Sequence, residues 1–213
     1  MNNEILDITL RSLAISSSAT VLALTWSIPA SIRIAAMKSK WRDPIIGIFN
    51  TLIGFPTVLV GLLLYLLFSR AGPLGLLNML YTPQAIVIGQ AILITPLLIS
   101  LMYEVFTKAI GDYWELAMSL GASKSQAYKL VMREVIGDIV VISLIGFARA
   151  IGELGVALLV GGNIKGITRV LTTAIALEVE KGEFEEAIIL GAILLMTILI
   201  IVVTARVVKR RFQ

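Results

Sequence analysis

Long apolar runs constrain the fold of this chain more than any other feature. A helix that crosses the hydrocarbon core of a membrane needs about 20 mostly apolar residues. Five segments of the 213-residue chain meet that length: 12–32, 44–68, 84–103, 135–160 and 187–208. No stretch between them is long enough for a separate soluble domain. We therefore expect residues 1–213 to form one all-α integral membrane domain with five transmembrane helices.

The composition argues against several other classes of protein. Hydrophobic residues make up 58% of the chain, which is above the usual value for soluble domains. Because the chain has no Cys and no His, neither a disulfide framework nor an ordinary zinc or haem site is expected, and no metal site is predicted. The basic residues lie in short clusters beside apolar runs rather than along an aromatic-rich face, so nucleic acid is not an expected partner.

Basic residues also predict the orientation of the spans. If residues 104–134 lie in the cytoplasm, 12 basic residues fall on the cytoplasmic side, 5 fall outside and Arg149 lies within a span. Cytoplasmic loops are enriched in Lys and Arg, so this bias predicts an outside N-terminus and an inside C-terminus. The first ten residues carry Glu4 and Asp7 but no basic residue, unlike a cleaved signal peptide. The first span is therefore expected to stay in the chain.

Three successive spans contain a proline, at Pro29, Pro56 and Pro96. In a membrane, the carbonyl that a proline frees must be satisfied by a neighbouring helix or by water. The prolines predict either ordinary kinks or hinges around a cavity. The connection 69–83 is apolar for a loop outside the membrane, and it is compatible with a short surface helix or with a re-entrant gate.

A polar island at residues 112–134 separates two apolar runs. Gly121 stands where a helix places its left-handed C-terminal residue. Ser123, with Gln126 three residues later, predicts a capping box that opens a second helix. Before the glycine, four residues at helical spacing form one apolar stripe: Tyr113, Leu116, Ala117 and Leu120. The island therefore predicts a short helix, a tight turn and a second helix.

The fourth span carries charges at membrane depth. Each costs about 2.5–3.5 kcal/mol on insertion scales, so these side chains should face protein or water. Arg149 and Glu153 are four residues apart, share a helix face and can pair. Two interpretations stay open: a structural ion pair that fixes helix packing, or an anion pathway in which Glu153 holds Arg149 in place.

The segment after this span is rich in glycine and basic residues. Gly161, Gly162 and Asn163, with Lys165 and Arg169 close by, predict either an anion-binding backbone nest or a flexible external turn. The acidic stretch 178–186 predicts a solvated helix face or a docking patch for a partner. No Gly-x4-Gly-Lys-Ser/Thr motif occurs, so ATP hydrolysis is expected on another polypeptide.

Several of these residues resemble a known family. Glu115, Ala117, Gly121 and Val131 have the spacing of the cytoplasmic EAA loop of importer-type ABC transporter permeases, although Arg133-Glu134 replaces the family's Leu-Pro. Segments 147–155, 160–164 and 168–175 resemble the molybdate/tungstate/sulfate branch, and 67–75 with 80–83 is similar to its tungstate permeases. The resemblance implies a type I ABC importer permease fold with a cytoplasmic coupling helix.

On this resemblance, the expected function is ATP-driven import of an oxyanion, with tungstate first and molybdate or sulfate as alternatives. It implies a homodimer in the plasma membrane of a prokaryote, two cytoplasmic ATPase subunits that hold ATP–Mg, and an extracytoplasmic oxyanion-binding protein. No cofactor is expected in this chain. An ATPase-independent secondary transporter or channel, or a structural membrane subunit, are the alternatives from other classes.

Two groups of residues are the expected functional sites. The coupling helix is expected to use Tyr113, Glu115, Leu116, Ala117, Leu120, Gly121 and Ser123. The pathway and its gate are expected to use Arg149, Glu153, Gly161, Gly162 and Asn163.

Overall fold

The computed structural model describes residues 2–212, which contain helices, turns and connections but no strand. Three helices are long and apolar enough to cross a membrane, or five spans if each of two bent helix pairs counts as one. In chain order the elements are α1 (Asn2–Ala35), α2 (Arg42–Leu52), α3 (Thr57–Phe68), the 3-10 turn η1 (Gly75–Leu77), α4 (Pro83–Ala109), the π-helical turn η2 (Ile110–Trp114), α5 (Glu115–Ser119), α6 (Lys124–Ile151), α7 (Gly155–Gly161), α8 (Leu171–Lys181) and α9 (Phe184–Phe212).

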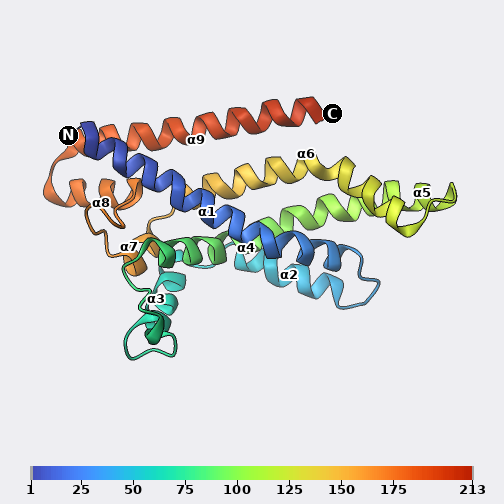
Figure 1. The fold of residues 1–213 in the computed structure, drawn as a ribbon, viewed down its shortest axis with the longest axis horizontal. Helices are drawn as coiled ribbons and strands as arrows, with labels where there is room; N and C mark the ends of the chain where they lie inside the picture. The colour runs from blue at the N-terminus through green and yellow to red at the C-terminus, as the bar shows by residue number, and fades with distance from the viewer. Residues whose placement is uncertain (1, 213) are drawn as a thin grey trace.

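The helices form an elongated bundle with α4 at its centre (Figure 1). Helices α1 and α6 pack along α4, and α9 packs along α6 and α8. The loop between α5 and α6 projects at one end of the molecule, whereas α8 lies at the opposite end, near the N-terminus. Helix α3 leaves the bundle at an angle, and its start packs against α7.

The core of the bundle is apolar and uses small residues on α1. Leu98, Met102 and Phe106 of α4 are at most 1% exposed, and they pack with alanines of α1 such as Ala19 and Ala23. Small residues let two helices approach closely inside a membrane. Several polar side chains of α1 bond within the chain, as Ser16 does when its hydroxyl donates to Gln90 Oε1 across the α1–α4 contact (3.2 Å), whereas the buried Ser27 hydroxyl has no partner among the described residues.

Two of the predicted spans are broken rather than continuous. Between α2 and α3 the chain bends by 94°, and between α6 and α7 it bends by 59°. Pro56, four residues after the end of α2, adopts an extended conformation at the residue that precedes α3. Pro29 and Pro96, in contrast, lie inside the uninterrupted helices α1 and α4. Only Pro56 therefore marks a change of direction in the chain.

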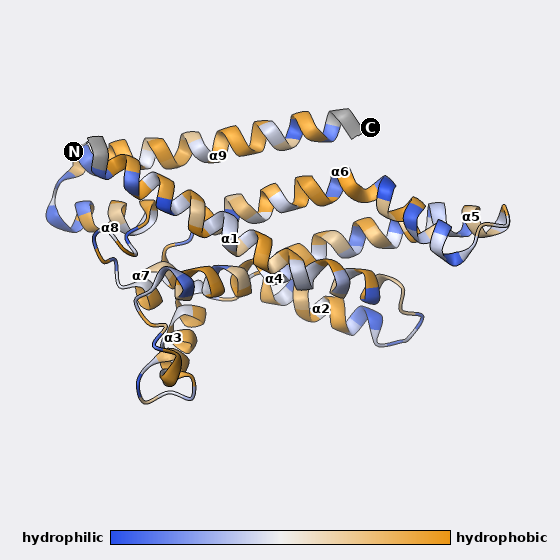
Figure 2. Cartoon of the chain, in the orientation of Figure 1, coloured by the Kyte–Doolittle hydropathy of each residue, from blue (hydrophilic) through white to orange (hydrophobic). Residues whose placement is uncertain are grey.

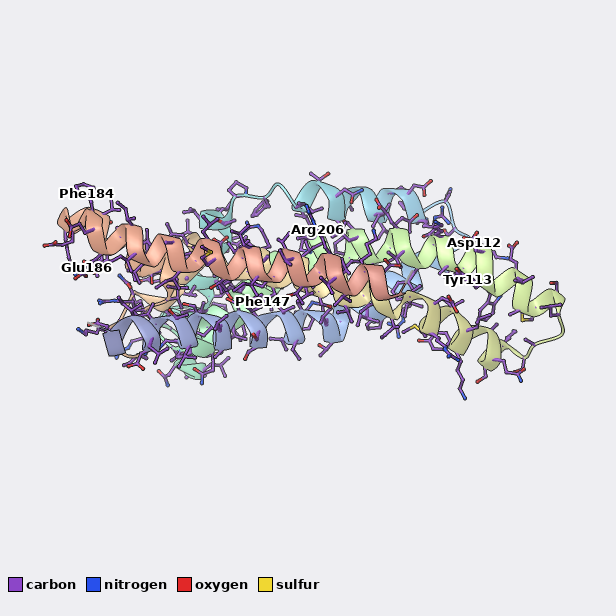
Figure 3. All side chains as sticks on the ribbon, turned by 90° about the horizontal axis from the view of Figure 1, so that it is seen from above. Asp112, Tyr113, Phe147, Phe184, Glu186 and Arg206 are labelled. Carbon is purple, nitrogen blue, oxygen red and sulfur yellow. The ribbon has the colours of Figure 1, made fainter. Side chains whose placement is uncertain are left out.

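The hydropathy of the surface follows the expected pattern of a membrane protein. Apolar residues cover the long helices, and hydrophilic residues gather at the two ends of the bundle (Figure 2). Helix α9 leaves most of its apolar side chains exposed, including Leu195 and Ile200. Its acidic Glu186 and its basic Arg206 lie toward opposite ends (Figure 3). The connection 69–83 contains the short 3-10 turn η1 just after Pro73, where the sequence predicted a short surface helix or a re-entrant gate.

Candidate functional site

The polar island forms the tip of a hairpin of residues 104–134, hereafter the α4–α6 hairpin. The tip helix is not separate from the preceding span, because α4, η2 and α5 form one helical rod, Pro83–Ser119. A 37-residue rod is about 55 Å long, against about 30 Å of hydrocarbon, so roughly 25 Å of it extends beyond a membrane. The sequence predicted a short separate helix here; the rod instead continues through a π-helical turn, a feature that recurs at functional sites.

Gly121 ends the rod in the way its position predicted. Its φ is +81°, the left-handed conformation that glycine adopts without steric cost. The N–H of Gly121 donates to Met118 O (3.1 Å), and the N–H of Ala122 donates to Ala117 O (3.0 Å). This bonding pattern is a Schellman motif, and it turns the chain back sharply toward α6.

The predicted capping box at the start of α6 is also confirmed. Ser123 N–H donates to Gln126 Oε1 (2.8 Å), and Gln126 N–H donates to Ser123 Oγ (3.4 Å). Ser123 therefore shapes the tip through hydrogen bonds to the backbone of α6.

The apolar stripe predicted at the tip divides into two faces. Ala117 is buried, whereas Leu116 is 54% and Leu120 is 79% exposed. Tyr113 and Glu115 are exposed as well, and Figure 3 shows Tyr113 on the projecting hairpin. Large apolar side chains at the end of a projecting hairpin, beside a charged residue, form a surface that a partner protein can cover.

Arg149 and Glu153 do pair, but not on one continuous helix. Helix α6 ends at Ile151, and Glu153 lies in the break before α7. Arg149 Nη1 donates to Glu153 Oε2 (2.8 Å), and the other carboxylate oxygen accepts from Val156 N–H (3.3 Å). Thr172 Oγ1 donates to the Glu153 carbonyl (2.8 Å). Glu153 is thus pinned by three partners and is 3% exposed, whereas the Arg149 side chain is 41% exposed.

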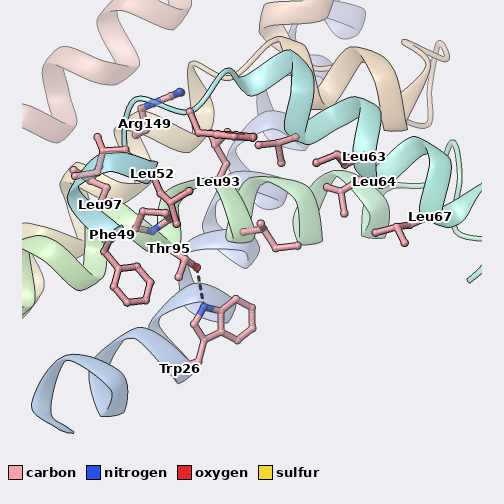
Figure 4. A pocket seen from close by; sticks show the side chains of 15 residues that line it. Trp26, Phe49, Leu52, Leu63, Leu64, Leu67, Leu93, Thr95, Leu97 and Arg149 are labelled. Atoms are coloured by element: carbon pink, nitrogen blue, oxygen red, sulfur yellow. Dashed lines mark hydrogen bonds between the residues drawn. The ribbon is translucent and has the colours of Figure 1, made fainter. Parts of the chain in front are cut away.

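The exposed side of Arg149 faces a groove, hereafter the α2–α4 groove. The groove has a volume of about 660 Å³, and its walls are largely apolar side chains of α2, α3 and α4. Arg149 is the one charged side chain among the described residues that line it. Trp26 Nε1 donates to Thr95 Oγ1 (2.8 Å) at its edge (Figure 4). Sequence reasoning missed Leu52, Ile53 and Phe55 as walls of this groove, although Gly54 and Pro56 signalled a break there.

Gly161 and Gly162 are required by close packing. A Cβ on Gly161 would lie 2.6 Å from Ile86 Cδ1, and one on Gly162, whose φ is +70°, would lie 2.6 Å from Tyr81 Cδ1. Tyr81 N–H also donates to Val160 O (2.8 Å). The Tyr81 hydroxyl is hydrogen-bonded to Tyr65, which raises the pKa of Tyr81 above its ordinary value. These residues make a packed turn rather than a loose one.

The basic residues near this turn already have acceptors. Asn163 Oδ1 accepts from Arg169 Nε (3.3 Å), Lys165 Nζ donates to Glu4 Oε2 (2.8 Å), and Arg169 lies 3.6 Å from the same carboxylate. Arg11 donates to the carbonyls of Arg169 and Gly166 (3.0 Å each). The basic side chains beside the predicted nest are therefore held by the chain's own acceptors. No pattern in the local sequence predicted that Glu4 and Arg11 would bond to residues 165–169.

The acidic stretch 178–186 is only partly solvated. Glu178 is 7% exposed and accepts from Lys181 Nζ (2.9 Å), whereas Glu180 and Glu183 are exposed as predicted.

We refer to the first turns of α1, residues 161–170 and α8 together as the α8 cap. The expected pathway group is thereby divided: Arg149 and Glu153 adjoin the groove, whereas Gly161, Gly162 and Asn163 belong to the α8 cap. Residues 2–212 contain no cluster of three or more acidic side chains suited to a metal ion.

Comparison with known proteins identifies related membrane proteins. Residues 27–212 match the family described as binding-protein-dependent transport system inner membrane component. The chain is 38% identical over 185 residues to the tungstate uptake system permease protein of Peptoclostridium acidaminophilum, covering 87% of this chain and 81% of that protein. It is 37% identical over 200 residues to a probable anion ABC transporter permease protein of Haloferax volcanii, covering 92% and 86%. The molybdenum transport system permease protein of Azotobacter vinelandii is more distant, at 26% identity over 185 residues, covering 83% and 81%.

Proposed function

Because the chain belongs to the family of binding-protein-dependent transport system inner membrane components, we propose that it is the permease subunit of an ATP-driven oxyanion importer, with tungstate as the first substrate. The observation that carries this proposal is the 38% identity to a tungstate uptake permease over 87% of the chain. Molybdate and sulfate are the alternative substrates. The protein is a multi-pass inner-membrane protein of a prokaryote.

The proposed assembly is a homodimer with two cytoplasmic ATPase subunits and an extracytoplasmic oxyanion-binding protein. Each copy crosses the bilayer five times, with each bent helix pair counted as one span, the N-terminus outside and the C-terminus inside. ATP–Mg is held and hydrolysed by the partner subunits, and this chain carries no cofactor. Its own contribution is to connect an event at the cytoplasmic tip with an opening inside the membrane.

The α4–α6 hairpin supports this division of labour. Leu116, Leu120, Tyr113 and Glu115 present a partly apolar surface at the tip, and Gly121 and Ser123 fix its shape. We propose that an ATPase subunit binds this surface. When the ATPase dimer closes, the movement of the tip is passed along the rod Pro83–Ser119 into the membrane.

The pathway is proposed to use Arg149, with Glu153 holding its guanidinium. A guanidinium donates several hydrogen bonds in a fork that matches an oxyanion, so it suits a doubly charged tetrahedral ion. Gly161, Gly162 and Asn163 are proposed to shape the outer end of the pathway by keeping the α8 cap closely packed. The chain performs no covalent chemistry in this scheme.

The test is the elemental content of cells with and without this chain, measured by mass spectrometry at trace supply of each oxyanion. Selective loss of tungsten is the expected result. Equal loss of molybdenum would widen the substrate to both ions, and loss of sulfur alone would make sulfate the substrate. No change in any of the three elements would overturn the oxyanion importer. A secondary transporter would take up the ion without its ATPase, so deletion of the ATPase gene separates that alternative.

A further inference from the structure

Two spans of this chain are broken, and the two breaks lie against each other. The first break, residues 53–56, lies between α2 and α3, and the second lies between α6 and α7. A Cβ on Gly155, the first residue of α7, would lie 3.0 Å from Thr57 Oγ1 and 3.1 Å from Val58 N at the start of α3. A Cβ on Gly61 would lie 3.1 Å from the Gly155 carbonyl oxygen. The start of α3 therefore rests directly on the start of α7.

The first break exposes non-helical backbone at membrane depth. Residues 53–56 are all exposed. Thr95 and Pro96 line the facing wall of the α2–α4 groove, and they lie in the middle of α4, which places the break at membrane depth. Irregular backbone inside a bilayer is tolerated only where protein covers it or water reaches it, because hydrocarbon cannot accept or donate hydrogen bonds. This face of the chain therefore contacts protein or water rather than the lipid tails.

Arg149 leads to the same conclusion independently. Its side chain is 41% exposed and opens into the α2–α4 groove, where Figure 4 shows it above Leu52. A charge at this depth faces protein or water rather than lipid. Broken helices that meet near the midplane of the membrane, with one charged group beside them, are the arrangement in which transporters place their substrate.

The two breaks differ in how firmly they are held. The second is fixed by the Glu153 carboxylate, which bonds Arg149 and Val156 N–H, and by Thr172. At the first break, no described side chain caps the start of α3, and a Cβ on Gly54 would have only Thr51 O as a neighbour. Of the two, the α2–α3 break is the one that can change shape without breaking side-chain hydrogen bonds.

We propose that the α2–α4 groove is the membrane segment of the anion pathway and that residues 53–56 are its gate. This inference rests on the proposed function and names the step inside the membrane. Arg149 contacts the dianion there, and Ile53 and Phe55 open or close the way to it. Glu153 already pairs with the guanidinium (2.8 Å) and the other walls of the groove are largely apolar, so the contact with the anion is weak enough for the ion to leave, as conduction requires.

Cysteine substitution tests the gate cleanly, because the native chain has no Cys. Phe55→Cys and Leu63→Cys place a thiol in the groove, whereas Leu62→Cys places one on the same helix outside it. Each variant is reconstituted in vesicles with the ATPase and the binding protein, and it is labelled with a membrane-impermeant sulfonated thiol reagent on both sides, with and without ATP. We expect labelling of Phe55→Cys and Leu63→Cys, slowed by tungstate, and no labelling of Leu62→Cys.

Three results would overturn the proposal: groove cysteines that are not labelled in any state, equal labelling of Leu62→Cys and Leu63→Cys, or labelling that no oxyanion slows. Failure of the proposed function looks different, because wild-type vesicles would then import none of the three oxyanions. Failure of the gate alone would give importing vesicles whose groove cysteines are inaccessible or unprotected.

Arg149 is tested by the ratio of ions imported to ATP hydrolysed. We expect Arg149→Gln to lower uptake several-fold more than ATP hydrolysis, and Arg149→Lys, which keeps the charge, to recover part of the ratio. Equal loss of uptake and hydrolysis in both variants would make Arg149 a structural residue and remove it from the pathway. Folding of each variant is checked by its yield as a complex with the ATPase.

Discussion

The α8 cap and the α4–α6 hairpin lie at opposite ends of the molecule and keep their shapes by different means (Figure 1). In the cap, distant segments are joined by side chains: Arg11 donates to two carbonyls near Arg169, and Ser12 Oγ accepts from Leu171 N–H (2.8 Å). In the hairpin, the bonds are local, as in the Ser123 capping box, and no ion pair joins described residues of 104–134.

The charges at the two ends are also arranged differently. Several charges of the cap are paired within the chain, and a cavity of about 250 Å³ there is bordered by Glu4, Lys165, Arg169, Glu178 and Lys181. The hairpin tip leaves Leu116 and Leu120 exposed. The difference teaches that the cap is held together by contacts between distant segments of its own chain, whereas the hairpin carries the surface proposed to bind a partner, although the cap also leaves Ile167 and Val179 exposed. The predictions below test this contrast.

The largest effect is expected at the tip. Gly121→Asp should lower ATP-dependent uptake by about a hundredfold, because it places a charge in the proposed docking surface. The chain should stay folded, because no atom lies within 4 Å of a Cβ at this position. The matched control is Gly121→Asn, which has the same shape, tolerates positive φ and carries no charge. Uptake and the yield of membrane-inserted protein are measured together. Equal uptake by the two variants would show that the tip does not carry the coupling.

At the second helix break, Glu153→Ala should lower the free energy of unfolding by about 2 kcal/mol. The substitution leaves the buried Val156 N–H without its acceptor and the partly exposed Arg149 without its ion-pair partner. Thermal unfolding of the purified protein in detergent measures the loss. Glu180→Ala removes an exposed carboxylate from α8 and should leave the transition unchanged. A destabilisation by Glu180→Ala as large as that by Glu153→Ala would refute the role of the buried bonds.

In the α8 cap, Ser12→Ala should cost about 1–2 kcal/mol, because the buried Leu171 N–H loses its acceptor. Hydrogen exchange should quicken at the start of α8. The exposed Ser18 on the same helix provides the control, as Ser18→Ala. If exchange at Leu171 is the same in both variants, the α1–α8 bond does not hold the cap.

The smallest effect is expected for Ser123→Ala, which removes one half of the capping box and should cost about 1 kcal/mol. The loss should appear as faster hydrogen exchange in the first turn of α6, with no change in the overall unfolding temperature. Ser125→Ala, two residues later and also exposed, should leave exchange unaltered. A fall in the overall unfolding temperature would show that the hairpin is coupled to the core more firmly than its contacts indicate.

The features that the sequence predicted correctly depend on residues that are neighbours in the chain. Gly121 and the Ser123–Gln126 box depend on residues within one helical turn, and the structure confirms both. The apolar runs predicted an all-helical membrane chain for the same reason, since hydropathy is a property of neighbouring residues. The Arg149–Glu153 pair was also foreseen from spacing, although a helix end lies between the two residues.

The features that the sequence did not predict depend on contacts between segments that are far apart in the chain. Gly54 and Pro56 signalled the break in span 44–68, but no local pattern shows that Gly61 and Gly155 pack α3 closely against α7. Glu178 looks solvated by composition but is buried against neighbouring elements. The π-helical turn η2 likewise follows from packing around the hairpin rather than from a residue pattern.

The unbroken rod of α4, η2 and α5 has a mechanical consequence. From Pro96, buried beside the groove, to Ser119 at the tip is about 35 Å, and from Pro96 back to Pro83 is about 20 Å. In the proposed coupling, a rod that pivots at Pro96 would act as a lever with unequal arms. A movement of the tip would reach the other end reduced to roughly 0.6 of its size, with a proportionate gain in force. Such a lever gives a smaller movement with a larger force, which suits a transporter that must separate closely packed helices by a small amount.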